Sequence, residues 1–175
     1  SDTTAPSFFH GAQGQSLTYT VNTLIVDVNA TDASGLSNFS VNDTTKFTIN
    51  NSGYLTNNSL LSTGLHYALV TVNDTYNNND TLTYVITVTD GIAPTWDEYP
   101  SNISVELGGT FSVDFNASDD VAISAYYLND TTRFSINNGN GIVSQGTLGV
   151  GKWYALVSVN DTANNINSTV FTVNV

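Results

Sequence analysis

Gly64-Leu-His-Tyr-Ala-Leu-Val-Thr-Val-Asn-Asp-Thr75 recurs 87 residues later as Gly151-Lys-Trp-Tyr-Ala-Leu-Val-Ser-Val-Asn-Asp-Thr162. The same offset aligns Phe47-x-Ile49-Asn50 with Phe134-x-Ile136-Asn137. Self-similarity at one fixed period is typical of arrays in which each copy is a structural module. The repeat therefore predicts two domains, residues 1–90 and residues 91–175.

Short alternations of apolar and polar residues, broken by Asn, Asp and Gly clusters, run through both copies, and no segment has helical periodicity. This pattern is typical of an all-β protein, and seven strands per copy suit a two-sheet Greek-key sandwich. We expect strands near residues 16–20, 23–30, 36–41, 46–50, 53–57, 66–73 and 81–88, and near 103–107, 110–117, 123–128, 133–137, 141–145, 152–160 and 167–175. Alternation predicts inward faces made by Leu24, Val26, Val28 and Ala30, and by Phe111, Val113, Phe115 and Ala117.

The connection between the copies, Thr89-Asp-Gly-Ile-Ala-Pro94, is short. A connection of this length cannot act as a long flexible tether, so we expect two tandem sandwiches arranged end to end. Asp2-Thr-Thr-Ala-Pro6 resembles this junction at an offset of 88 residues. The start of the sequence therefore looks like another junction, and we interpret the sequence as a piece of a longer array.

Charge and composition exclude several functions. Fifteen acidic residues stand against Lys46, Arg133 and Lys152 among 175 residues, which gives a net charge of −12. Nucleic acid is excluded as a partner because its phosphates bind Lys and Arg, and this acidic surface would repel them. No apolar run approaches the roughly 20 residues of a membrane-spanning helix, so no direct membrane span is expected. The absence of Cys excludes disulfides and cysteine catalysis.

The chain is rich in Asn-x-Ser/Thr sequons, the acceptor sequence for N-linked glycans. Twelve sequons occur, where this content of Asn, Ser and Thr predicts about six by chance. Turns favour the same residues, but the excess favours an exported, N-glycosylated surface protein. The candidate residues are Asn29, Asn38, Asn42, Asn50, Asn57, Asn73, Asn79, Asn102, Asn116, Asn129, Asn160 and Asn167.

Asn-Asp-Thr occurs four times, at residues 42, 73, 129 and 160, each time after an apolar strand residue. The tripeptide is at once a sequon, a former of Asx turns and a carboxylate able to bind a cation. We favour turn formation, with which glycosylation is compatible. Lys46 and Arg133 each follow the Asp of such a turn by three residues, which predicts a local ion pair or an edge charge that blocks aggregation.

Several segments resemble known extracellular repeats, and the resemblance covers both copies. It implies an immunoglobulin-like or cadherin-like sandwich, in which Tyr67 and Tyr154 resemble a tyrosine corner or are ordinary strand aromatics. The segments similar to a cadherin repeat are Ala30-x-Asp32-Ala-Ser-Gly35, Phe39-Ser-Val41, Gly53-x-Leu55, Tyr67-x-Leu69-x-x-Val72-x-Asp74 and Val88-Thr-Asp90. Those similar to bacterial Ig-like, hyalin-type repeats of prokaryotic cell-surface proteins are Asp119-Asp-Val-x-Ile123, Val159-Asn-Asp161-x-Ala163-x-Asn165 and Phe171-x-Val173.

The cadherin resemblance implies calcium at the domain ends. Cadherins hold calcium with a mid-domain acidic motif, a linker of the form Asp-x-Asn-Asp-Asn and an Asp-x-Asp pair. This sequence departs from that pattern at Leu60-Leu-Ser62 and at Asp90-Gly-Ile-Ala-Pro94. Calcium takes about six to eight oxygens, of which the chain supplies a part, so weak binding is expected. The carboxylates in question are Asp32, Asp74 and Asp90, or Asp119, Asp120 and Asp161.

The sequence holds no pattern typical of an enzyme. His10 and His66 sit in unlike contexts, without Cys, Asp or His at ligand spacing near His66, and a structural or surface role is expected for them. Nucleophile motifs and Gly-rich phosphate loops are absent. Aromatic residues could form a sugar-stacking platform, although Trp96 and Trp153 are in places where packing is the commoner role. The other members of that set are Tyr99, Tyr126 and Tyr127.

These features favour a structural or adhesive module of an extracellular, N-glycosylated cell-surface protein, such as a stalk, surface-layer or adhesin segment. Its expected partners are neighbouring repeats of the same protein, other subunits or surface glycans. One alternative is a subunit of a filament assembled by strand addition at a sheet edge, although Pro6, Gly11 and Gly14 interrupt the segment 1–15 that would donate the strand. The other is a carbohydrate-binding module.

Overall fold

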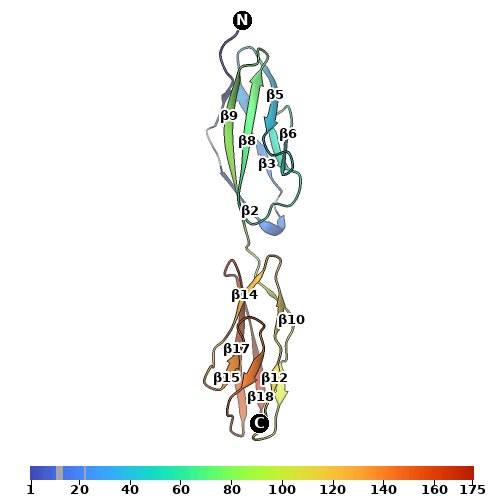
Figure 1. The fold of residues 1–175 in the computed structure, drawn as a ribbon, viewed down its shortest axis with the longest axis vertical. Helices are drawn as coiled ribbons and strands as arrows, with labels where there is room; N and C mark the ends of the chain where they lie inside the picture. Colours follow the sequence, from blue (N-terminus) through green and yellow to red (C-terminus); the bar gives the residue numbers. More distant parts are fainter. Residues whose placement is uncertain (11–13, 22) are drawn as a thin grey trace. The chain divides into compact units, whose positions relative to one another are not determined.

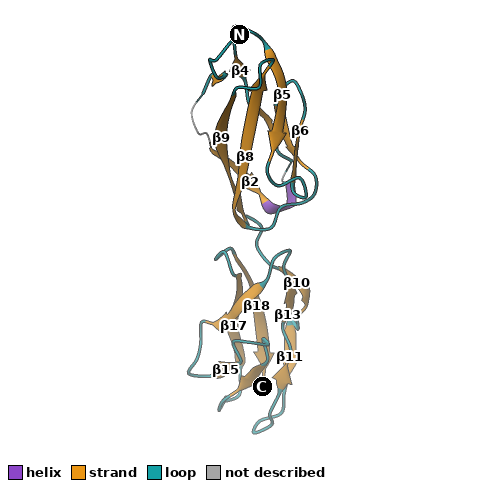
Figure 2. Cartoon of the chain, turned by 45° about the horizontal axis from the view of Figure 1, so that its top comes forward, coloured by secondary structure: helices purple, strands orange, loops and turns teal. Residues whose placement is uncertain are grey.

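A computed structural model describes residues 1–10, 14–21 and 23–175. The chain divides into two compact units, Ser1–Asp90 and Gly91–Val175, which follow one another in the colours of Figure 1. Each unit consists of strands and loops, and the helical segment of the described part is the 3-10 turn η1 (Tyr19–Val21), drawn in purple in Figure 2. No described helix is long and apolar enough to cross a membrane.

The first unit is a sandwich of two sheets. Its strands are β1 (Ser7–Phe8), β2 (Gly14–Thr18), β3 (Ile25–Asp27), β4 (Ala30–Thr31), β5 (Leu36–Val41), β6 (Phe47–Ile49), β7 (Tyr54–Asn57), β8 (Gly64–Asp74) and β9 (Asn79–Thr89). One sheet has the order β2-β9-β8-β5 and the other the order β3-β7-β6, and β1 pairs with β4. Only the β2–β9 pairing among these is parallel.

The second unit repeats this plan. Its strands are β10 (Thr95–Glu98), β11 (Asn102–Ser104), β12 (Ser112–Val113), β13 (Asn116–Ser118), β14 (Ile123–Leu128), β15 (Phe134–Ile136), β16 (Val143–Gln145), β17 (Lys152–Asp161) and β18 (Ile166–Asn174). Its sheets have the orders β11-β18-β17-β14 and β12-β16-β15, and β10 pairs with β13. Neighbours such as β14 and β17 are not consecutive in the chain, as in a Greek key. The predicted all-β sandwich fold is thus confirmed.

The inward faces are those that alternation predicted. Leu24 and Val28 are buried and Val26 packs against them, whereas Ile25 between them is 64% exposed. In the second unit, Phe115 is fully buried, and its ring centroid lies 5.4 Å from that of Phe171. Each such side chain stabilises the fold by about 1.5–3 kcal/mol through its burial, and no residue is shared between the two core clusters of the described chain.

The strands differ in one respect from the prediction. Each unit has nine described strand segments instead of seven, because the predicted strands 23–30 and 110–117 are each interrupted and because β1 and β10 come before them. The interruption falls where Val28 N–H donates to Gly53 O and Phe115 N–H donates to Gly141 O, on the neighbouring chain segment. Hydrogen bonding to the neighbouring segment therefore continues at each interruption, although the residues there are not part of a regular strand.

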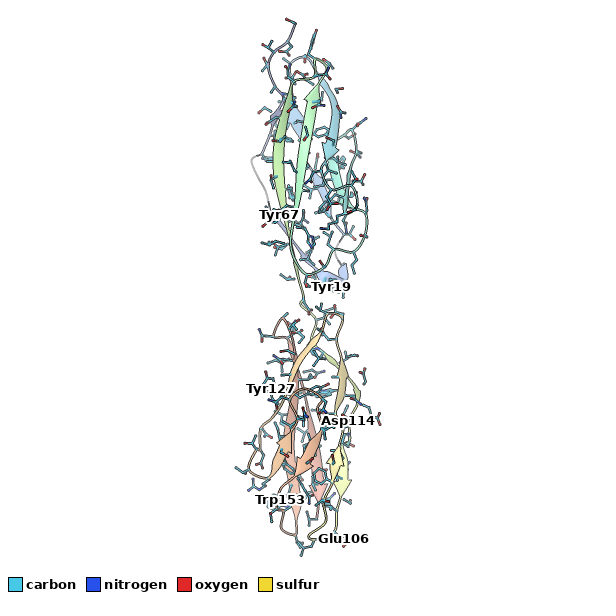
Figure 3. All side chains as sticks on the ribbon, viewed as in Figure 1. Tyr19, Tyr67, Glu106, Asp114, Tyr127 and Trp153 are labelled. Atoms are coloured by element: carbon cyan, nitrogen blue, oxygen red, sulfur yellow. The ribbon has the colours of Figure 1, made fainter. Side chains whose placement is uncertain are left out.

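The comparison of Tyr67 and Tyr154 with a tyrosine corner is wrong. Both side chains face solvent, with 56% and 58% exposed, and Figure 3 labels Tyr67 on β8. The inward positions of β8 are His66, Ala68 and Val70, so the two-residue period of the strand sends Tyr67 to the opposite face. A tyrosine corner requires the ring on the core side.

The N-terminal segment already has partners in its own unit. Ser7 and Phe8 pair with Thr31 and Ala30, and β2 pairs along its whole length with β9. Strand donation to another subunit would require these ladders to open, which counts against the filament alternative. Residues 11–13, which include Gly11, lie outside the described residues.

Candidate functional site

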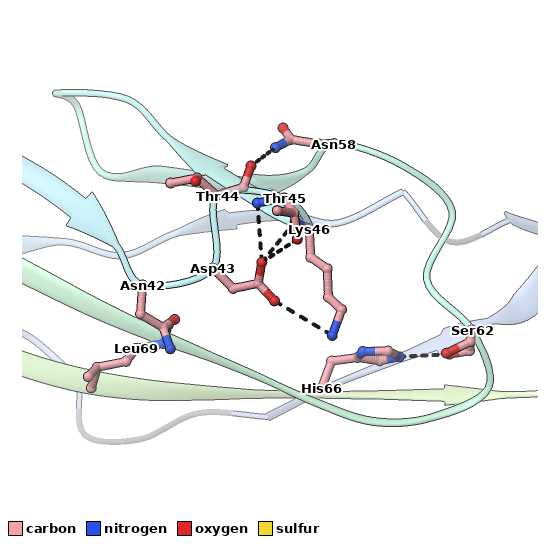
Figure 4. A network of polar contacts seen from close by, with 9 residues as sticks. All are labelled: Asn42, Asp43, Thr44, Thr45, Lys46, Asn58, Ser62, His66 and Leu69. Atoms are coloured by element: carbon pink, nitrogen blue, oxygen red, sulfur yellow. Dashed lines mark hydrogen bonds and ion pairs between the residues drawn. The ribbon is translucent and has the colours of Figure 1, made fainter.

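Two of the four Asn-Asp-Thr segments form exposed Asx turns (Figure 4). Asp43 Oδ1 accepts hydrogen bonds from the backbone N–H and hydroxyl of Thr45, at 3.1 and 2.6 Å, and Asp43 Oδ2 lies 3.6 Å from Lys46 Nζ. The Thr45 hydroxyl and the Lys46 amide and charge lower the pKa of Asp43. Asp130 repeats the arrangement, and the hydrogen bond from Arg133 at 2.8 Å helps to lower its pKa to about 2. The predicted turns and local ion pairs are confirmed.

The Asn of these turns has a structural role of its own. Asn42 Oδ1 accepts a hydrogen bond from the N–H of Leu69 at 3.0 Å, and Asn42 N–H donates to Leu69 O (Figure 4). Asn129 and Leu156 repeat both bonds in the second unit. The side-chain oxygen thus extends the β5–β8 ladder beyond the end of β5, and both Asn42 and Asn129 are exposed.

The other two Asn-Asp-Thr segments have buried carboxylates. Asp74 and Asp161 are 0% exposed. Asp74 Oδ1 accepts from the N–H of Tyr76 and Asn78, at 2.8 and 2.9 Å, and Oδ2 accepts from Asn78 Nδ2 at 2.7 Å. Asp161 repeats these bonds with Ala163 and Asn165. Each of the two hairpins contains an Asn with positive φ, Asn77 at 66° and Asn164 at 70°. Asn tolerates this conformation better than most residues.

One group of carboxylates in the first unit has the geometry of a cation site. Oxygens of Asp2, Asp32 and Asp74 lie within 4.8 Å of one another. Asp32 Oδ1 is held by the N–H and hydroxyl of Ser34, at 2.8 and 2.6 Å. The prediction of Asp32 and Asp74 as neighbours is consistent with this arrangement, but their third partner is Asp2 and not Asp90. The match between Asp2-Thr-Thr-Ala-Pro6 and the junction at Asp90 was the signal that could have identified Asp2.

The second unit keeps part of this arrangement. Asp119 and Asp120 follow β13, and their carboxylate oxygens lie within 4.8 Å of each other. Asp119 Oδ1 accepts from the N–H of Val121 and Ala122, whereas Asp119 Oδ2 is buried and has no hydrogen-bond partner among the described residues. Among the described residues, Asp161 belongs to no carboxylate group of three, although its oxygens make the same hairpin bonds as those of Asp74. Asp90 is the last residue of the first unit.

The twelve sequons differ in how far their Asn side chains reach solvent. Asn160 is only 7% exposed, with Oδ1 accepting from Ala125 N–H and Nδ2 donating to Asn164 Oδ1. Asn38, Asn57, Asn73 and Asn167 are half-buried, and Asn167 Nδ2 donates to Pro94 O at 2.8 Å. The exposed sequon residues are Asn29, Asn42, Asn50, Asn79, Asn102, Asn116 and Asn129.

His66, Trp96 and Trp153, the candidates for a chemical or sugar-binding role, all take part in packing. His66 is buried, and its Nε2 lies 2.7 Å from Ser62 O (Figure 4). Trp96 packs against Tyr99, Phe115 and Tyr126 with ring centroids 6.0 to 6.2 Å apart. Trp153 packs against the core of the second unit, and its Nε1 donates to Gly149 O. Both Trp residues thus have the packing roles that the sequence predicted.

No family model and no curated protein matches the sequence. Solved structures match its fold: immunoglobulin domains 1–4 of sidekick-1 give a TM-score of 0.59 at 14% identity, over 97% of this chain and 48% of that chain. The fold is that of immunoglobulin and cadherin domains. Drosophila N-cadherin EC1-4 gives 0.55 at 18% identity, over 97% and 48%, and mouse cadherin-23 EC22-24 gives 0.52 at 21% identity, over 97% and 64%. At these identities the likeness shows the fold alone, and the chain spans about half to two thirds of those chains.

Proposed function

We propose that this chain is a non-catalytic structural or adhesive segment of an extracellular cell-surface protein, built from tandem repeats as in a stalk, surface layer or adhesin. The observation that carries the proposal is the repetition of a whole sandwich, core and turns together. Its recurring polar residues are used inside turns and ladders, as for Asp74 and Asp161. The shared fold with cadherin and immunoglobulin domains and the resemblance to hyalin-type repeats of prokaryotic surface proteins support it.

Location is tested on intact cells that produce the protein. Brief protease treatment of washed cells is expected to release peptides of this chain, since a surface segment is reachable without lysis. An abundant cytoplasmic protein from the same cells serves as the control for leakage. Recovery of the chain from the lysed cytoplasm, with none released from intact cells, would contradict the proposal.

N-linked glycans are the second part of the proposal. Attachment requires an accessible Asn Nδ2, so Asn42 and Asn129 are expected to carry glycans, and Asn160 is expected to carry none. Peptide mapping by mass spectrometry of the natively produced protein measures this. Absence of added sugar at every sequon removes the glycan part and leaves the structural role standing.

Calcium is the third part, and the Asp2, Asp32 and Asp74 group supports it. Carboxylates this close repel each other, and a hard cation with oxygen ligands relieves that repulsion. With calcium tenfold above Kd, binding stabilises the folded unit by about 1.4 kcal/mol and raises Tm by about 5–10 °C.

The calcium test compares Tm in excess chelator and in millimolar calcium. Wild type is expected to shift, and Asp32→Ala to lose the shift. Asp43→Ala, which removes a carboxylate from an exposed turn outside this group, is the matched control and should keep it. An unchanged Tm of the wild type would remove calcium from the proposal.

A further inference from the structure

The outward side of the four-stranded sheet in each unit is called here the open face. On a strand it consists of the residues that alternate with buried ones. In the first unit it consists of every second residue from Leu65 to Asn73 on β8 and from Asn79 to Thr87 on β9. In the second unit it consists of every second residue from Lys152 to Ser158 on β17 and from Ile166 to Asn174 on β18.

In the part of the chain that the structure describes, the open faces carry no acidic side chain, although the protein has fifteen acidic residues. The outward residues of the flanking strands are also uncharged: Ser16 and Ser40 in the first unit, and Ser104 and Tyr127 in the second. Of the described residues on these faces, only Lys152 is charged. Strands outside the two four-stranded sheets differ, because β3 exposes Asp27 and β10 exposes Asp97 and Glu98. The net charge of −12 is therefore carried by other parts of the surface.

The open faces also expose large apolar side chains. Leu65, Tyr67 and Leu69 follow one another on β8, and Tyr67 is directly opposite Val85 on β9. In the second unit, Tyr154 and Val170 are exposed, and Tyr127 joins them from β14 (Figure 3). The pairs Tyr67 and Tyr154, and Leu69 and Leu156, recur at the 87-residue offset. Contiguous exposed apolar side chains mark interaction surfaces.

Three of the sequons on the open face of the first unit lie at one end of it. Asn38, Asn73 and Asn79 stand side by side across β5, β8 and β9, next to the hairpin of Asp74. At the other end, the sequon residue Asn42 is hydrogen-bonded to Leu69, as Asn129 is to Leu156 in the second unit. Glycans on Asn38, Asn73 and Asn79 would leave Leu65 and Tyr67 uncovered, and a glycan on Asn42 would border the apolar end at Leu69.

We propose that the open faces dock a second copy of this chain, an inference that rests on the proposed adhesive function. Two copies with a net charge of −12 repel each other wherever acidic side chains meet, and like charges across an interface cost several kcal/mol. The open faces are where two copies can meet without bringing carboxylates together. Both partners then present the same patch, as in a two-fold symmetric dimer, with Tyr at its centre.

A sugar is a less suitable occupant of this surface. Small ligands bind in concave sites, and a hollow of the first unit is lined by Val26, Leu82 and Tyr84, which are not on the open face. An extended, uncharged sheet face with aliphatic neighbours around each Tyr suits another flat protein surface better.

The test places acids on the open face of the full chain. The double variant Tyr67→Asp and Tyr154→Asp adds two charges there, and the matched control Tyr54→Asp and Tyr76→Asp adds the same two charges at exposed Tyr residues off this face. Sedimentation velocity over a wide concentration range measures self-association. Wild type and control should form dimers, and the open-face variant should dimerise at least about tenfold more weakly.

Circular dichroism must show an unchanged Tm for each variant; if the double variant is destabilised, Thr83→Asp and Thr172→Asp on the same faces replace it. A wild type that stays monomeric throughout, or a control weakened as much as the variant, overturns the proposal. A monomer that binds immobilised glucan and loses it on the same substitutions also overturns it, in favour of a carbohydrate site. None of these outcomes affects the cell-surface location, which the protease treatment tests separately.

Discussion

At the scale of single residues, the recurring Asn-Asp-Thr segments are explained by the donors around them. Asp74 and Asp161 are fully buried, a costly place for a carboxylate unless hydrogen bonds satisfy it. Each receives bonds from two backbone amides and one Asn side chain of its own hairpin. Charge-assisted bonds of this kind are stronger than neutral ones, so the same residue is required in both repeats.

Asp161→Ala is expected to destabilise the second unit strongly. The substitution removes the charged acceptor of the N–H groups of Ala163 and Asn165 and of the Asn165 side chain. Hydrogen bonds to charged groups contribute about 1.5–3 kcal/mol each, so the free energy of unfolding in urea should fall by at least about 2 kcal/mol. Asp114→Ala, at an exposed position, should change it by about 0.5 kcal/mol or less, and equal losses in the two variants would refute this account.

Asp130, in a turn at the surface, is expected to titrate with a pKa of about 2, because Arg133 and Thr132 donate to its charged form. A depressed pKa in the folded state means that the stability from Asp130 is present above its ordinary value of 3.8 and is lost as pH falls through about 2. NMR titration of the carboxyl carbon measures this. Arg133→Ala should move the midpoint toward 3.8, and an unchanged midpoint would contradict the assignment to Arg133.

At the scale of strands and turns, two glycines fix how the three-stranded sheets are built. Gly53 and Gly141 come shortly before β7 and β16, with φ of 82° and 71°. A Cβ on Gly53 would lie 2.7 Å from Val28 O, and one on Gly141 would meet Phe115 O. Both the positive φ and the close backbone approach require glycine, and the requirement recurs in both repeats.

Gly141→Ala is expected to lower the stability of the second unit by at least about 2 kcal/mol, through left-handed strain and the clash with Phe115 O. Gly149→Ala is the matched control, because a Cβ there meets nothing within 4 Å and should be nearly neutral. Chemical denaturation of the two variants compares them. A loss at Gly141 no larger than that at Gly149 would show that the turn adapts.

The sequence predicted the elements better than the site. Alternation is a local property, so Leu24, Val28 and Phe115 could be assigned to the core, and the turns at Asp43 and Asp130 could be recognised from adjacent residues. The convergence of carboxylates is not local, because it depends on three separate segments meeting at one end of a sandwich. Asp2 was missed and Asp161 was grouped wrongly for this reason.

The same limit applies to Tyr67. Its position near the start of a strand suggested a tyrosine corner, but the face to which a side chain points depends on the phase of the alternation. That phase is set by His66, Ala68 and Val70, which face the core. An exposed stripe of a strand is expected to be polar, but its members here are Leu65, Tyr67 and Leu69. The pattern alone therefore left the phase of β8 open.

At the scale of the whole molecule, each unit has what a domain needs to fold alone. Each has its own buried cluster and both of its own sheets. The polar contacts at the start of the second unit also show where it begins, since Asn165 Nδ2 donates to Ile92 O and Asn167 Nδ2 donates to Pro94 O. Residues 92–94 therefore belong with the second sandwich and are not a free linker.

A fragment of residues 91–175 is accordingly expected to fold by itself with cooperative urea unfolding, because it keeps the whole second cluster and the contacts of residues 92–94. A fragment of residues 95–175 keeps the cluster but lacks Ile92 O and Pro94 O, which accept from Asn165 and Asn167, and it should be less stable by about 1–3 kcal/mol. Two-dimensional NMR spectra of both fragments, overlaid on that of the full chain, report the fold. If the fragment 91–175 gives the narrowly dispersed spectrum of an unfolded chain, folding of the second unit depends on the first. The boundary at residue 90 would then separate two compact units that are not independent folding domains.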